Sequence, residues 1–169
     1  MDNMIPYKGI SPKVAKDVFI ADSAQLIGQV TLGPESSVWF QCVLRGDINT
    51  ITIGKRSNIQ DLTAVHLSSD TCVTIGDYVT VGHNAVIHGC VIEDNVIIGM
   101  GACILDRAVI PKNSIVGANS LVTSGKTFPE GSLIVGSPAK AVRQLRPEEI
   151  QGITDNALHY VEYSKEYRN

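Results

Sequence analysis

The feature that most constrains the fold of this chain is a six-residue repeat with the pattern aliphatic-x-x-x-small-x. The fifth position is Ala, Ser, Thr, Cys or Val in sixteen of eighteen units, and Ile48 and Lys126 are the exceptions. A 3.6-residue helical stripe or a heptad would not keep this spacing, whereas a six-residue period indicates a solenoid. The units start at Val14, Ile20, Leu26, Leu32, Val38, Leu44, Ile53, Ile59, Val65, Ile75, Val81, Ile87, Ile92, Ile98, Ile104, Ile110, Val116 and Val122.

Each unit predicts one short strand whose aliphatic and small residues point inward. Three strands would form one triangular coil, so the eighteen units predict about six coils, stacked about 4.8 Å apart. We therefore predict an all-β solenoid over about residues 14–140. The spacing resembles that of left-handed parallel β-helices. The left-handed sense is taken from this resemblance, because it departs from the usual right-handed crossover rule.

A turn and one helix are predicted after the repeats. The segment 136–140, Gly-Ser-Pro-Ala-Lys, has the residue types of a turn that closes the prism. Pro147 followed by two glutamates is typical of a helix start. Apolar and small residues then recur at a 3–4 spacing, which predicts an amphipathic helix over about 147–167 on the outside of a prism, its own or a neighbour's. The length of 169 residues predicts one domain, 1–169.

Composition narrows the function further. The net charge of −3 does not favour nucleic acid as a partner. The longest uncharged apolar run, 96–105, is too short to span a membrane, so no membrane partner is expected. The N-terminus carries Asp2 and lacks a basic-then-apolar signal pattern, which favours a cytoplasmic location. Four cysteines without C-x-x-C spacing predict reduced thiols.

The register of the repeat places three chemistry-bearing residues in one column. The units can be assigned in turn to three faces if the repeat is interrupted at three places. These are three extra residues at 50–52, four extra residues at 71–74 and one residue missing before Ile92. Arg45, His66 and His88 are then each the second, outward residue of a unit on the third face. Successive coils lie one strand spacing apart, so His66 and His88 can share a metal ion.

His83 falls elsewhere in the same register. It is the third residue of a second-face unit, so it lies around a corner from His66 and His88. A neighbouring subunit could supply it if the third face of one prism met the second face of the next in a closed ring of three. Three histidines leave one coordination position open, as in catalytic zinc sites. The register thus predicts metal sites between the subunits of a homotrimer.

At this level of detail the chain resembles the gamma-class carbonic anhydrases and the ferripyochelin-binding-like hexapeptide-repeat proteins. The resemblance runs from about Ile20 to Lys140 and rests on five stretches, Val43-Leu-Arg-Gly-Asp47, Asn58-Ile-Gln-Asp61, His66, Val81-Gly-His83 and Ile87-His-Gly89. It implies that His66, His83 and His88 bind zinc, or iron or cobalt. It also implies catalytic or supporting roles for Arg45, Asp47, Gln60, Asp61 and Tyr160.

The resemblance implies the reversible hydration of CO₂ to bicarbonate. Zinc lowers the pKa of bound water to about 7, which generates the hydroxide that attacks CO₂ at neutral pH. Gln60 would orient water or substrate, and Asp61 would anchor an imidazole N–H or Arg45. Arg45 and Asp47 resemble an ion pair between subunits, and Arg45 could also face bicarbonate. One departure concerns the proton exit. No glutamate stands at Ile48 or in the segment 67–72, so the glutamate shuttle of some family members is absent and Asp70 or buffer would have to serve.

Other functions remain open at this stage. The hexapeptide fold also serves acyltransferases that bind coenzyme A between coils, and relatives hydrolyse acyl-coenzyme A thioesters. A further alternative is a non-catalytic trimer stapled by its metal. The fold alone does not choose among them, and metal content together with assays on CO₂ and on thioesters would separate them.

Overall fold

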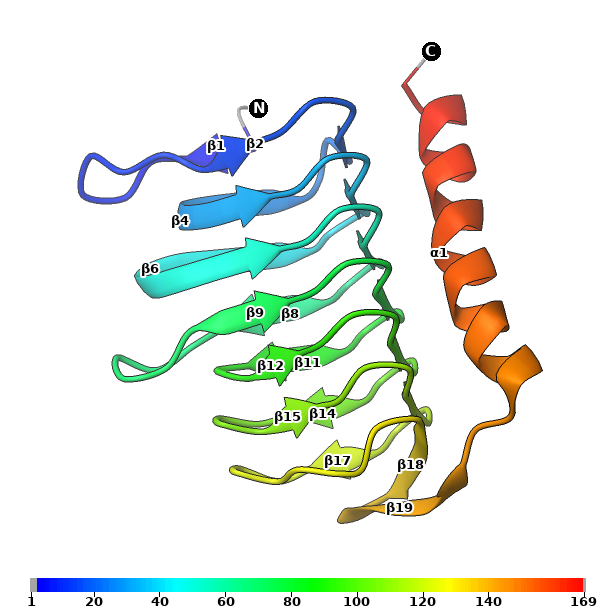
Figure 1. Cartoon of the computed structure of the whole chain (residues 1–169). Helices are drawn as coiled ribbons and strands as arrows, with labels where there is room; N and C mark the ends of the chain where they lie inside the picture. The colour runs from blue at the N-terminus through cyan, green and yellow to red at the C-terminus, as the bar shows by residue number, and fades with distance from the viewer. Residues whose placement is uncertain (1–2, 169) are drawn as a thin grey trace.

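A computed structural model describes residues 3–168 as a left-handed parallel β-helix with one helix along its side (Figure 1). The predicted domain, 1–169, includes Met1, Asp2 and Asn169, which lie outside the described residues, and the single-domain assignment stays a prediction. The elements are β1 (Met4–Ile5), β2 (Lys13–Val14), β3 (Phe19–Ile20), β4 (Gln25–Leu32), β5 (Ser37–Val38), β6 (Val43–Ile53), β7 (Asn58–Ile59), β8 (Ala64–His66), β9 (Val73–Ile75), β10 (Thr80–Val81), β11 (Val86–His88), β12 (Val91–Ile92), β13 (Ile97–Ile98), β14 (Cys103–Ile104), β15 (Val109–Ile110), β16 (Ile115–Val116), β17 (Leu121–Val122), β18 (Ser132–Gly136), β19 (Ala139–Gln144) and α1 (Pro147–Glu166).

The strands form the three predicted faces. The second face contains β3, β5, β7, β10, β13, β16 and β18, all paired in parallel. The third face contains β1, the first parts of β4 and β6, and β8, β11, β14 and β17. The first face contains β2, the later parts of β4 and β6, and β9, β12 and β15. Because β4 and β6 each turn a corner, they join the first and third faces in one hydrogen-bonded sheet.

Seven turns are present rather than the predicted six or so. The extra strands lie at the two ends of the prism. One is β1, which pairs with β4 ahead of the first predicted unit, and the other is β18, whose Ile134 is fully buried and pairs with Val116 one coil above. The segment that leads to β18, 123–131, breaks the six-residue spacing, so the pattern alone misses it. As predicted, the repeat residues form the core: every predicted unit start is buried except Val14 and Ile20, in the first turns of the chain.

The register differs from the prediction at one corner. Ile51 pairs with Val30 above and with Val73 below, so the extra residues precede these two positions instead of lying at 50–52 and 71–74. The missing residue before Ile92 is confirmed, because Ile92 pairs with Ile75. Both insertions therefore lie at the corner that leaves the third face. Here the fifth positions of three units, Ile48, Ser69 and Val91, are not buried. Ile51, Leu67 and Cys90 fill the interior in their place.

The sharp corners of the prism require left-handed backbone. Twelve described residues other than glycine have positive φ, and all of them lie between strands. Four are asparagines, including Asn84 with φ of 56° and Asn119 with φ of 55°, and asparagine tolerates this region because its short polar side chain can bond locally. Leu62, with φ of 65° and a side chain that is more than half exposed, has no such advantage. Hydrogen bonding between coils holds it, because its N–H donates to the Phe40 carbonyl at 3.0 Å.

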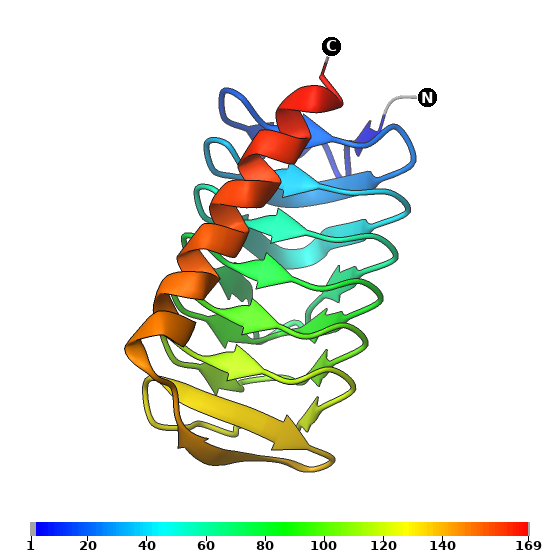
Figure 2. The same ribbon diagram turned by 90° about the vertical axis from the view of Figure 1, so that its right-hand side faces the viewer.

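The helix packs along the second face of its own prism (Figure 2). The β18–β19 hairpin, with its turn in the predicted 136–140 segment, ends the prism and sends the chain back toward the N-terminal coils. Ile153, Ala157, Val161 and Ser164 are the buried residues of α1, as the 3–4 spacing predicts. Thr80 donates to Asn156 Oδ1 at 2.8 Å, and Thr154 donates to Asn95 Oδ1 at 2.7 Å. Within residues 3–168, no helix combines the length and apolarity needed to cross a membrane.

A charged group fastens the start of α1 to the hairpin before it. Glu149 accepts two hydrogen bonds from Arg143, each at 2.8 Å, and one from the Arg146 backbone N–H at 2.9 Å. The Arg143 guanidinium and the Arg146 N–H therefore hold the pKa of Glu149 well below its usual range. A carboxylate in the first turn also complements the positive end of the helix.

We predict that Glu149→Gln lowers the melting temperature at pH 7 and that this difference shrinks in acid. The folded-state pKa of Glu149 lies below the unfolded value of 4.5, so its contribution is complete above pH 4.5 and is lost as the pH falls toward the folded-state pKa. Thermal unfolding at pH 7, 5 and 3 measures the difference. Glu148→Gln, which removes a carboxylate that is two-thirds exposed, is the matched control. A difference of equal size at pH 3 and pH 7 would contradict the assignment.

Candidate functional site

Two of the three predicted metal ligands face each other on the third face. His66 ends β8 and His88 ends β11, and the two residues are paired in register, as predicted. Their rings stand one coil apart with centroids separated by 5.3 Å. The nitrogens that face each other, His66 Nδ1 and His88 Nε2, are 3.3 Å apart. Arg45 occupies the same column one coil above His66, since Leu44 pairs with Val65.

A carboxylate holds the far nitrogen of each ring. Asp47 Oδ1 lies 3.0 Å from His66 Nε2, and Asp106 Oδ1 lies 2.6 Å from His88 Nδ1. Burial by itself raises the pKa of Asp47, but the hydrogen bonds from Arg45 and His66 outweigh it and hold this pKa below its usual value. The pKa of Asp106 is lowered in the same way, by His88 and Ser68 against the effect of burial. Both groups therefore remain carboxylates at neutral pH and accept the ring protons.

This pair of rings fits two ligands of a metal ion. When Nε2 of His66 and Nδ1 of His88 carry the protons, the two facing nitrogens present lone pairs to each other. Two zinc–nitrogen bonds of about 2.05 Å at a tetrahedral angle would separate their nitrogens by about 3.3 Å, and 3.3 Å is the separation found. A carboxylate on the second nitrogen of a ligating histidine is the usual support for its orientation.

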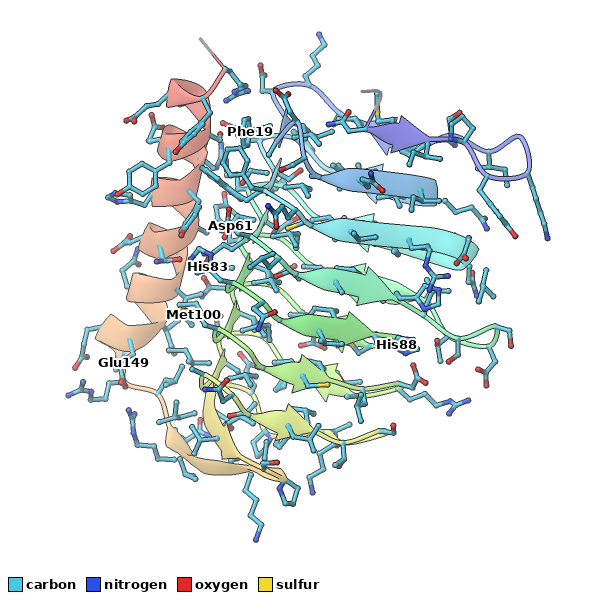
Figure 3. All side chains as sticks on the ribbon, turned by 180° about the vertical axis from the view of Figure 1, so that it is seen from behind. Phe19, Asp61, His83, His88, Met100 and Glu149 are labelled. Atoms are coloured by element: carbon cyan, nitrogen blue, oxygen red, sulfur yellow. The ribbon has the colours of Figure 1, made fainter. Side chains whose placement is uncertain are left out.

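His83 lies in a different place, at the corner between the second and third faces. Its Nδ1 is 2.7 Å from Asp61 Oδ2, and Asp61 Oδ1 accepts a hydrogen bond from the Phe40 N–H at 3.2 Å. Figure 3 shows His83 and Asp61 beside α1, with His88 away from them at the opposite end of the third-face strands. Asp61 thus anchors an imidazole, one of the two roles expected for it, and leaves His83 Nε2 free of that contact.

Gln60 belongs to the same region as His83. Its side chain is 5% exposed, and Nε2 donates to Asn58 Oδ1 at 3.1 Å. Asn58 in turn donates to Thr80, and Thr80 donates to Asn156 on α1. This chain of donors fixes the orientation of the Gln60 amide, so its oxygen Oε1 is the atom left to accept a hydrogen bond. Gln60 and His83 both line a cavity of about 220 Å³.

Tyr160 links this region to an aromatic pocket under α1. A pocket of about 410 Å³ is lined by Asp61, His83, Tyr160 and Glu166 together with the rings of Trp39, Phe40, Tyr163 and Tyr167. The Tyr160 ring lies edge-on to Trp39, with centroids 5.6 Å apart. Burial, and secondarily the charge of Asp61, raises the pKa of Tyr160, so the phenol remains protonated at neutral pH. Trp39 and Phe40 were not singled out from the sequence, because aromatic residues at a corner carry no distinctive spacing.

The residues of the candidate site therefore form two separate groups within one chain. The third-face group contains Arg45, Asp47, His66, His88 and Asp106, and the helix-side group contains Gln60, Asp61, His83 and Tyr160. Ala85 to His88 alone spans on the order of 10 Å of strand, so His83 cannot reach the other two histidines of its own chain. Among residues 3–168, no three His, Cys, Asp or Glu side chains gather closely enough to hold a metal ion.

Arg45 and Asp47 were expected to pair between subunits, but the structure pairs them within the single chain. Arg45 Nη1 donates to Asp47 Oδ2 at 2.6 Å, while the other Asp47 oxygen contacts His66. Asp106 is the one member of the third-face group that sequence reasoning missed. Only the register of the repeat could have identified it. Asp106 belongs to the third-face unit that follows the unit of His88, which places it one coil away from that histidine.

Comparisons with known proteins agree with this description. The family model described as bacterial transferase hexapeptide (six repeats) matches residues 89–124. A probable carbonic anhydrase of Methanocaldococcus jannaschii is 53% identical over 90% of this chain and 96% of its own length. Gamma carbonic anhydrase 2, mitochondrial, of Arabidopsis thaliana is 47% identical over 89% of this chain, which spans only 56% of that protein. A solved hexapeptide transferase family protein of Anaplasma phagocytophilum superposes with a TM-score of 0.95, at 40% identity over 99% of both chains.

The left-handed prism and its six-residue repeat define a hexapeptide-repeat protein. At 53% identity to a relative matched over almost its full length, the chain belongs to the gamma carbonic anhydrase family.

Proposed function

We propose that this protein is a metal-dependent carbonic anhydrase that interconverts CO₂ and bicarbonate at sites shared between the subunits of a homotrimer. The observation that carries the proposal is the pair of facing nitrogens on His66 and His88, 3.3 Å apart with a carboxylate behind each ring. His83 has a carboxylate of its own but lies around the corner. His83 could therefore join the pair only from another chain.

The surface beside the histidines supports a subunit interface. Outward side chains one position before the third-face unit starts form a column. Its first member, Gln25, is polar, and the five below it are apolar: Val43, Ala64, Val86, Cys103 and Leu121. Val43 is 39% exposed and Val86 is 42% exposed. An exposed apolar column of this kind marks a protein interaction site. In a closed three-fold ring, this column would meet the corner of the next subunit that carries His83, because α1 already covers the second face of each prism.

We propose zinc as the metal, with iron or cobalt as substitutes, because imidazole ligands suit all three. His66 Nδ1, His88 Nε2 and His83 Nε2 of a neighbouring chain would hold it. When bound, the metal supplies a water whose pKa is about 7, and thus a nucleophile at neutral pH. Gln60 Oε1, from the chain that supplies His83, would accept a hydrogen bond from that water and orient it. The Arg45 guanidinium, 44% exposed beside His66, provides positive charge for bicarbonate.

A second candidate function is the hydrolysis or transfer of an acyl thioester. The aromatic pocket of about 410 Å³ beside His83 is far larger than the triatomic CO₂ requires. A metal-supplied nucleophile could attack a thioester carbonyl as well as CO₂. Assays with acyl-coenzyme A substrates on the metal-loaded protein distinguish the two functions.

The first expectation concerns metal content. Purified protein should contain about one divalent ion per chain. His66→Ala or His88→Ala should remove it, because each substitution deletes one of only three protein ligands. Elemental analysis measures the content, and an anomalous difference map locates the ion. An ion held wholly within one subunit, or none after purification with added zinc, would contradict the proposal. His159→Ala, on the exposed side of α1, is the matched control.

The second expectation concerns assembly. Neither His66→Ala nor His83→Ala trimers should bind metal, but a mixed trimer contains an interface where each variant supplies the ligands that the other lacks. Random exchange of equal amounts should restore about one quarter of the wild-type sites, because each interface needs one particular variant on each side. Metal content after unfolding and joint refolding measures the recovery. Mass spectrometry verifies that subunits have exchanged, and no recovery in exchanged trimers argues against shared sites.

The third expectation concerns rate. Hydration of CO₂ releases a proton that must leave the site, and Ile48 stands where a glutamate could carry it. Asp70 is engaged in an ion pair with Arg107 and does not face the stacked histidines in the described contacts. Activity should therefore rise with imidazole buffer concentration at fixed pH and ionic strength, and Ile48→Glu should raise activity at low buffer. Stopped-flow hydration measures both effects. Background rates in fully metal-loaded protein at high buffer would exclude carbonic anhydrase activity and leave thioesters as the next substrates.

A further inference from the structure

Asp106 joins three successive coils at the edge of the third-face group. Its Oδ1 lies 2.6 Å from His88 Nδ1, and its Oδ2 accepts a hydrogen bond from Ser68 Oγ at 3.0 Å. Ser68 belongs to the turn of His66, His88 to the next turn, and Asp106 to the turn after that, since β8, β11 and β14 are neighbours in this order. One carboxylate thus connects the ring of His88 with the segment that follows His66.

The segment 67–72, the latch loop, makes this reach possible. It holds the extra residues after β8, and it must cross two coils, on the order of 10 Å, to meet Asp106. Its own turn is closed by Thr71, whose Oγ1 accepts from the Ser68 N–H at 2.9 Å and whose N–H donates to the Ser68 carbonyl at 3.2 Å. Asp70, in the same loop, forms an ion pair with Arg107 next to Asp106.

The coil of His88, which lies between the coils of His66 and Asp106, leaves room at its corner for the latch loop. It is the coil that lacks one residue at this corner, and it contains Gly89 with φ of 53°. A β-carbon at Gly89 would collide with Asp106 Oδ1 and with Thr71 Oγ1. Gly89 is nevertheless tied to both neighbours, because its N–H donates to the His66 carbonyl and its carbonyl accepts from the Arg107 N–H. The insertion in one coil and the deletion in the next therefore fit each other.

We propose that Asp106, held in place by the latch loop, is a positioning residue that fixes the ring orientation and tautomer of His88. This inference rests on the proposed metal site. A carboxylate that accepts the Nδ1 proton leaves the lone pair on Nε2, the atom that faces His66. It also prevents the ring from turning over, which would replace Nε2 with a carbon atom. Asp47 holds the His66 ring in the same way through Nε2, so the orientations of both rings are fixed before a metal ion binds.

The alternative is that Asp106 only fastens the latch loop to the prism. A fastening role predicts lost stability without a specific change in metal binding. A positioning role predicts weaker and altered metal coordination even where the fold is intact. The two roles are therefore separated by measuring metal affinity and ligand field alongside unfolding.

The experiment uses the assembled full-length protein and cobalt(II) or zinc(II) as probes. Asp106→Asn keeps the shape of the side chain but removes its charge, and it should lower metal affinity by about 10- to 100-fold. Competition with a chromophoric chelator measures this affinity, and the visible absorption of the cobalt form should change with the coordination. Ser68→Ala, which frees one oxygen of Asp106, should cause a smaller loss in the same direction.

Asp94→Asn is the matched control. Asp94 is also a corner carboxylate, but it accepts from the Asp77 N–H at 2.8 Å and contacts no histidine. It should lower the unfolding temperature without changing metal affinity or the cobalt spectrum. If both aspartate variants weaken binding in proportion to lost stability, Asp106 is a fastening residue and the inference fails.

The remaining outcomes are also decisive. Wild-type affinity and spectrum in Asp106→Asn would overturn the inference and leave the proposed function standing, whereas a wild-type protein that binds no metal would overturn the proposed function itself. If Asp106→Asn does not fold, Ser68→Ala and Asp106→Glu decide the question. Unchanged metal affinity in both of these variants would overturn the positioning role.

Discussion

The whole molecule depends on parallel pairing that repeats in register from coil to coil. Each aliphatic unit start sits on the one above, as Ile87 sits on Val65, so the same position in successive coils faces the same direction at one strand spacing. This rule builds a continuous core from single residues on the inside. On the outside it stacks any side chain that recurs at one position, and it brings His66 and His88 together. The histidine pair is therefore a direct consequence of the same stacking that makes the prism stable.

Stacking alone would leave two imidazoles free to turn, and the carboxylates supply the missing specificity. Asp47 and Asp106 hold the outer nitrogens of His66 and His88, while Asp61 holds His83 on the other side of the prism. Each proposed ligand thus has its own acidic partner on a neighbouring coil. A residue displaced by one coil is the natural place for such a partner, because strand spacing brings its side chain within hydrogen-bonding distance.

The helix gives the helix-side group a different kind of support. Through Asn156 and Thr80, α1 orders the donors that fix the Gln60 amide, and through Tyr160 it closes the aromatic pocket beside His83. The prism provides positions at fixed spacing, whereas the helix covers one face and determines which polar atoms remain available. The division into two groups explains why a complete site in the proposed function requires the faces of two subunits.

The sequence by itself determined the prism, its three faces and the pairing of His66 with His88, because a six-residue period leaves little choice of register once the insertions are counted. The same register also placed His83 on another face, apart from His66 and His88. Only the tertiary structure decided the details of the corner at 67–72 and 89–90, the extra strands β1 and β18 at the two ends of the prism, and the contact of Asp106 with His88. The physical reason is that periodicity governs regular strands through backbone pairing. The path of an insertion, by contrast, depends on hydrogen bonds such as Ser68 to Asp106, made between coils that lie far apart in the sequence.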